Sequence, residues 1–89
     1  PPSVAELDEA IVQQYGDLTG CGLRPGRLLY LDARIKGHDG SVTGVVLGGE
    51  GSYGMSVSCV ENALTDMHFR PFDGVVDVRW AVQLDRPEP

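Results

Sequence analysis

The chain has 89 residues, of which 42% are hydrophobic and 22% charged, and its net charge is −6. This length and balance are typical of one small globular domain and exclude an intrinsically disordered segment. The acidic balance and the scattered basic residues also exclude a nucleic-acid surface, which requires clustered lysine and arginine. No apolar run is long enough to span a bilayer, so we expect no direct membrane insertion of this domain.

The first predicted element is a helix over residues 4–15. Ser3 and Glu6 have the spacing of a capping box, in which the hydroxyl accepts the Glu6 N–H and the carboxylate reaches back. We expect Gly16 to end this helix. Its core face is predicted from apolar residues at helical spacing, at Val4, Leu7, Ala10, Ile11, Tyr15 and Leu18.

Two strands then form a predicted hairpin, over residues 27–36 and 41–47, joined by an Asp-Gly turn at residues 37–40. The outer face of this hairpin is predicted to carry an apolar patch, contributed by Leu28, Tyr30 and Val45. The inner face of the first strand is predicted to carry Leu29, Leu31, Ala33 and Ile35.

The glycine-rich segment 48–54 lacks the lysine and the spacing of a phosphate loop, so we interpret it as a loop with Tyr53 exposed. A second helix is predicted over residues 56–67, where apolar residues recur at spacings of three and four. Arg70 and Pro71 end helical structure, because proline disfavours the helical conformation of the residue before it.

The last predicted strand, residues 75–84, alternates strictly. Such alternation is typical of a strand in a sheet with one covered face. We expect Trp80 to be a core anchor on the apolar face. That face carries Val76, Val78, Trp80, Val82 and Leu84, and the other carries Asp77, Arg79, Ala81 and Gln83.

These elements predict an α+β fold, a two-layer sandwich in the order α-β-β-α-β, with both helices on one face of a three-stranded antiparallel sheet. A right-handed crossover through the second helix gives the spatial strand order 2-1-3 and leaves the last strand at an edge. We expect one domain over residues 1–89, with residues 1–3 and 86–89 as linker ends.

Catalytic chemistry has little support, so we expect no enzyme and no cofactor. His38 stands in a turn and His68 at a helix end, where each is explained as a polar surface residue. Cys21 and Cys59 permit either one disulfide or two buried thiols, and Cys59 has no base beside it that would make it a nucleophile. Two cysteines and two distant histidines lack metal-ligand spacing.

Three segments together resemble the C-terminal domain of TonB-type energy transducers, and most closely the TonB-like domains of myxobacterial gliding-motility and envelope proteins. They are an alternating strand with its Asp-Gly turn (residues 26–42), the Gly-Ser-Tyr-Gly loop (residues 51–54), and the helix end that leads to Phe69 and Pro71. Met67 stands where that family usually has tryptophan. The resemblance covers about residues 26–84.

The resemblance implies a periplasmic domain of a longer protein anchored in the inner membrane. It implies binding of an outer-membrane or periplasmic envelope protein by strand addition at the last strand, in energy transduction, transport or motility. An oxidising periplasm favours a Cys21–Cys59 disulfide. We therefore expect a non-enzymatic interaction domain whose contact residues are Val75, Asp77, Val78, Arg79, Ala81 and Gln83.

Asp77 and Arg79 are expected to bias partner choice through their charge. Further contacts are expected on the sheet face at Leu28, Tyr30 and Tyr53. The alternative function is a self-associating structural module, a homodimer that buries the outer sheet face or pairs the edge strand with its copy.

Overall fold

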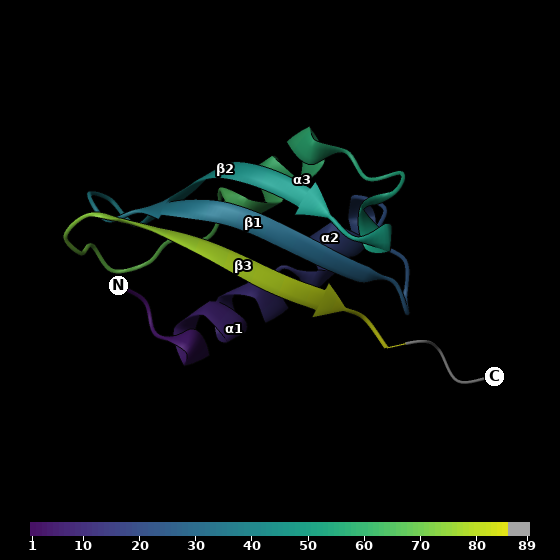
Figure 1. Cartoon of the computed structure of the whole chain (residues 1–89), viewed down its shortest axis with the longest axis horizontal. Helices are drawn as coiled ribbons and strands as arrows, with labels where there is room; N and C mark the ends of the chain where they lie inside the picture. Colours follow the sequence, from purple (N-terminus) through teal and green to yellow (C-terminus); the bar gives the residue numbers. More distant parts are fainter. Residues whose placement is uncertain (86–89) are drawn as a thin grey trace.

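The computed structural model describes residues 1–85 and confirms an α+β domain, in which helices cover one face of a three-stranded antiparallel sheet (Figure 1). The predicted linker end at 86–89 lies outside the described residues. The observed order is α-α-β-β-α-β, one helix more than predicted. The elements are α1 (Val4–Val12), α2 (Tyr15–Gly20), β1 (Leu28–Lys36), β2 (Ser41–Gly48), the 3-10 turn η1 (Glu50–Ser52), α3 (Val57–Leu64) and β3 (Val75–Gln83).

The predicted first helix over residues 4–15 was wrong in its extent, because the chain breaks there into α1 and α2. The capping box at its start is confirmed: the Glu6 N–H donates to Ser3 Oγ at 3.1 Å, and the Ser3 N–H donates to the Glu6 carboxylate at 3.4 Å. Gly16, the predicted end, lies inside α2. The break falls at Gln14, which is buried and can donate from its side-chain amide to the Ala63 carbonyl at 3.0 Å.

The second predicted helix is shorter than expected, since α3 ends at Leu64 and Met67 lies beyond it. Ser56 caps its start by accepting the Cys59 N–H at 3.3 Å. After α3 the chain turns to reach the hairpin, where the Phe69 N–H donates to the Gly40 carbonyl at 3.1 Å. Met67 is nevertheless buried, so its predicted place in the core is confirmed although its helical conformation is not.

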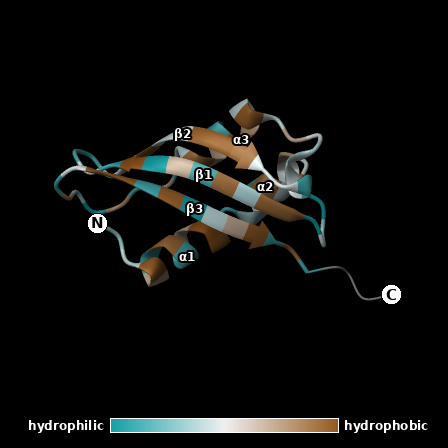
Figure 2. Cartoon of the chain, in the orientation of Figure 1, coloured by the Kyte–Doolittle hydropathy of each residue, from teal (hydrophilic) through white to brown (hydrophobic). Residues whose placement is uncertain are grey.

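The sheet has the predicted order β2-β1-β3, with β1 antiparallel to both neighbours. Figure 2 shows the alternation of hydrophobic and hydrophilic residues along β1 and β3. Trp80 is 4% exposed, and its Nε1–H donates to the Leu7 carbonyl of α1 at 3.0 Å, which confirms it as a core anchor. The fully buried side chains are Leu18, Leu23, Leu29, Leu31, Ile35, Val60, Leu64 and Val82.

A β-bulge in β2 corrects one prediction about the outer face. The register between β1 and β2 shifts between Asp32 and Arg34, at the point where Gly44 has a φ of +65°. A bulge adds one residue to its strand and so reverses the alternation of side chains beyond it. As a result Val45 packs against the core instead of joining the outer patch, and Val46 is 61% exposed.

Candidate functional site

The outer edge of β3, called here the β3 edge, is the side of Val75–Gln83 that faces away from β1. β3 pairs with β1 in an unbroken register from Leu28↔Gln83 to Lys36↔Val75, and within residues 1–85 it has no strand on its other side. Every second residue of such a strand points its N–H and C=O outward. These groups form a regular row of donors and acceptors that another strand can join.

The opposite edge of the sheet, on β2, is less regular. Its bulge at Gly44 interrupts the ladder, and bulges are a common means by which proteins blunt an exposed edge. β3 is a nine-residue strand that contains no glycine or proline. Of the two edges, that of β3 is therefore the better template for an added strand.

The predicted contact residues of β3 lie on both faces of the strand. Val78 is half-buried on the inner face, whereas the other five are exposed, with Val75 at 57%. The Gln83 side chain already donates to the Gly26 carbonyl at 3.0 Å. The five residues that share the outer face are Val75, Asp77, Arg79, Ala81 and Gln83.

Four charged side chains form what we call the charge ladder, which consists of Asp32 and Arg34 on β1 with Asp77 and Arg79 on β3. Arg34 Nε lies 2.9 Å from Asp77 Oδ1, and Arg79 Nε lies 2.6 Å from Asp32 Oδ1. The second guanidinium nitrogen of each arginine also donates to the same carboxylate, at 3.4 Å from Arg34 and 3.0 Å from Arg79. Both predicted partner-selecting charges are thus engaged with neighbours in the same sheet.

The ladder also sets the protonation of its carboxyls. The hydrogen bonds from Arg79, with a smaller contribution from its positive charge, hold the pKa of Asp32 below its usual value. The hydrogen bonds from Arg34 and its charge lower the pKa of Asp77 in the same way. Arg79 in addition lies over the Tyr30 ring, with its guanidinium carbon 5.2 Å from the ring centroid.

A shallow hollow of about 520 Å³ lies over the ladder on the outer face, with Thr43 and Gly44 at its β2 side. Its charged groups are paired with one another. Tyr53, 79% exposed, lines a separate hollow of about 310 Å³ with Arg24 and Arg27, and Leu28 and Tyr30 are half-buried.

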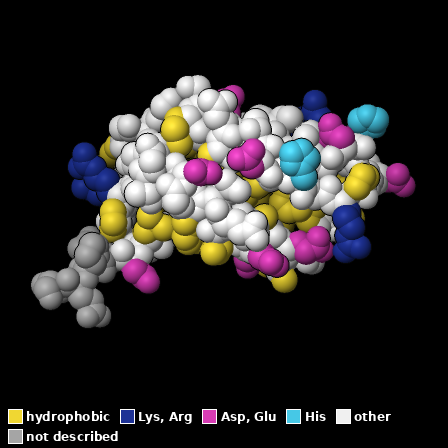
Figure 3. Space-filling view, turned by 180° about the vertical axis from the view of Figure 1, so that it is seen from behind, with side chains coloured by type: hydrophobic (Ala, Val, Ile, Leu, Met, Phe, Trp, Pro, Cys, Tyr) yellow, Lys and Arg dark blue, Asp and Glu magenta, His cyan; other side chains and the backbone are white. Residues whose placement is uncertain are grey.

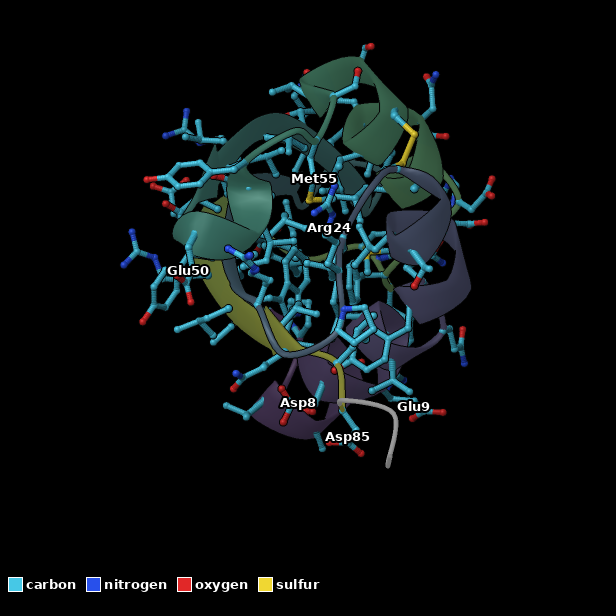
Figure 4. The ribbon with its side chains drawn as sticks, turned by 90° about the vertical axis from the view of Figure 1, so that its right-hand side faces the viewer. Asp8, Glu9, Arg24, Glu50, Met55 and Asp85 are labelled. Atoms are coloured by element: carbon cyan, nitrogen blue, oxygen red, sulfur yellow. A yellow bond between two sulfur atoms is a disulfide. The ribbon has the colours of Figure 1, made fainter. Side chains whose placement is uncertain are left out.

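The helix α1 runs beneath β3 on the inner face of the sheet (Figure 1). Figure 3 shows hydrophobic side chains that reach the surface along the lower rim of the helix face. On α1, Val4 is 74% and Val12 is 55% exposed. Figure 4 places Asp8 and Asp85 on the rim below β3. The β3 edge is therefore bordered by acidic side chains, a feature that the sequence did not reveal because it depends on where α1 lies.

Cys21 and Cys59 form a disulfide with an Sγ–Sγ distance of 2.07 Å, which decides between the two readings of the sequence. The bond joins the end of α2 to the first turn of α3. Cys59 is consequently not a free thiol nucleophile.

The other residues considered as catalytic groups do not form a cluster in the described part of the chain. His38 and His68 are exposed, and the Ser56 and Ser58 hydroxyls, 2.9 Å apart, contact each other at the start of α3. The described part of the chain contains no group of histidine, cysteine and acidic residues that could hold a metal ion. Within residues 1–85 no helix has the length and apolarity required to cross a membrane.

Comparisons with known proteins bear on none of these features: no family model matches the chain, and neither the curated proteins nor the solved structures yield a match.

Proposed function

We propose that this protein is a non-enzymatic interaction domain of the cell envelope that binds a partner protein by β-strand addition at the β3 edge. The observation that carries the proposal is the regular, unbroken edge of β3, set against the bulged edge of β2. In strand addition, main-chain hydrogen bonds supply affinity and alternate side chains supply specificity.

A periplasmic location in a longer, inner-membrane-anchored protein is part of the proposal. The Cys21–Cys59 disulfide supports an oxidising compartment, because such bonds are rare where thiols are kept reduced. The TonB-like segments of the sequence support a role in energy transduction or motility across the envelope.

The test is site-specific photo-crosslinking in cells, followed by mapping of the captured segment. A photoreactive residue at Val75 or Ala81 on β3 should capture a partner segment, and the same residue at the exposed Val46 on β2 serves as the matched control. The captured segment, made as a peptide, should then shift amide resonances of β3 in a two-dimensional NMR titration. Capture from Val46 alone, with shifts confined to β2, would rule out strand addition at β3.

The second candidate function is self-association through the outer face of the sheet. The observation that favours it is the alternation of signs in the charge ladder. A copy turned about an axis parallel to the strands would set its Arg79 opposite Asp32 and its Asp77 opposite Arg34. Every charge of the ladder would then meet an opposite charge, which is the self-complementarity that a two-fold interface requires.

A further inference from the structure

We infer that the β3 edge, if it binds by strand addition as proposed above, selects an extended, basic segment with apolar residues at alternating positions. The inference rests on that proposed function and adds the chemistry of the partner. Selectivity for the partner then comes from the inner face of β3 and from the acidic rim, and not from the charge ladder.

The first observation concerns the inner face of β3. Val76 and Val78 are only half-buried, although Ile35 and Ala33, their cross-strand partners on β1, are 0% and 5% exposed. All four residues lie in the same layer of the sheet. Within residues 1–85 the two strands differ in that β1 has a neighbouring strand on each side, whereas β3 has one only on the side of β1. The inner layer is therefore incomplete on the open side of β3.

An added strand would complete this layer. Its inward side chains would lie beside Val76 and Val78, above α1, whose Leu7 already contacts the core next to Trp80. Apolar side chains in these positions remove apolar surface from water on both partners. Because side chains alternate along a strand, the partner needs an apolar residue at every second position.

The second observation concerns charge. The outward side chains of an added strand would lie beside Asp77 and Arg79, whose charges are already satisfied by Arg34 and Asp32. The rim below the edge, in contrast, carries Asp8 and Asp85 (Figure 4). Neither of these aspartates lies within 4.0 Å of a basic group of the described chain, so lysine or arginine on the partner would find acceptors there.

The experiment is an NMR titration of the oxidised chain with three short capped peptides. The first alternates valine with threonine and has a lysine at each end. The second has glutamate in place of the lysines, and the third has the composition of the first with its valines contiguous. We expect shifts on β3 amides and the tightest binding for the first peptide. Compared with the first peptide, we expect the second to bind roughly two- to fivefold more weakly. We expect the third to bind more weakly by a factor of about five or more.

Variants then assign each preference to its residues. The double variant Val76→Thr with Val78→Thr should abolish the advantage of the alternating peptide, whereas Val46→Thr on β2 should leave it unchanged. Asp8→Asn with Asp85→Asn should abolish the advantage of the lysines, whereas Asp66→Asn, beside the disulfide, should not. If the valine variants fail to fold, the comparison of the three peptides on the natural chain still tests the preference for alternating apolar residues.

The outcomes distinguish strand addition at β3 from the inferred selectivity for the partner. Equal binding of the alternating and contiguous peptides, with β3 amides still shifted, would leave strand addition standing and overturn the inferred selectivity. Equal or tighter binding of the glutamate peptide would overturn its basic component. If no peptide shifts β3 amides, strand addition at this edge fails, and the inference fails with it.

Discussion

Gly40 shows how one backbone position sets the geometry between the hairpin and the segment that leads into β3. Its φ is +72°, and a Cβ there would overlap the backbone carbonyl of Phe69. We expect Gly40→Ala to lower the free energy of unfolding by about 2–3 kcal/mol, because strained dihedrals and the overlap act together. The measurement is urea denaturation. Gly16→Ala is the control, with open space around its Cβ inside α2, and should raise stability by up to about 1 kcal/mol.

The pKa values of Asp32 and Asp77 predict how stability depends on pH. Hydrogen bonds from their arginines lower both values from the usual 3.8. A carboxyl with a lowered pKa in the folded state contributes stability that is present above its unfolded pKa and lost as the pH falls through its folded pKa. We therefore expect thermal stability to fall as the pH drops below about 4, and to fall less in the double variant Asp32→Asn with Asp77→Asn. Melting curves between neutral and acidic pH measure this. An identical dependence of the melting temperature on pH in both proteins would contradict it.

Residue patterns in the sequence predicted the side chains of the core better than those of the candidate site. Strict alternation placed Trp80 inside and Asp77 outside, and the structure confirms both. Alternation does not give the cross-strand neighbour, which depends on register. For that reason the sequence does not reveal that Asp77 and Arg79 pair with Arg34 and Asp32.

Secondary-structure elements were predictable where the sequence marks their ends. Ser3 and Glu6 mark the start of α1, and the Asp-Gly turn marks the hairpin. The break between α1 and α2 carries no such mark, since Gln13 and Gln14 are ordinary helix residues and apolar spacing continues across them. The break is instead associated with the tertiary contact between buried Gln14 and the carbonyl of Ala63, which local patterns cannot reveal.

The disulfide ties the end of α2 to the first turn of α3. Replacing both Cys21 and Cys59 by serine removes a crosslink with a sequence separation of 38 residues. In the chain-entropy view this should lower the free energy of unfolding by about 3–4 kcal/mol. Urea denaturation of the oxidised chain and the double variant measures the difference. Equal midpoints would show that packing of α2 on α3 alone holds the two helices together.

The molecule as a whole leaves one face of its sheet uncovered within residues 1–85, which makes its oligomeric state a direct test of the second candidate function. If two copies join through the charge ladder, light scattering should show a dimer whose fraction rises with concentration and falls with salt. Arg34→Glu should weaken the association, because it sets like charges opposite each other. A monomer at all concentrations would exclude self-association and leave strand addition as the remaining proposal.

The Cys21–Cys59 bond also has a topological consequence. It closes a covalent ring that contains β1, β2 and η1, whereas α1 and β3 belong to the two tails outside it. The crosslink restrains neither tail, so local opening is expected to begin at α1 and β3, the elements that border the proposed binding edge. Native-state hydrogen exchange should accordingly proceed from the tails to the ring, with the amides of β1 that pair with β2 among the last to exchange.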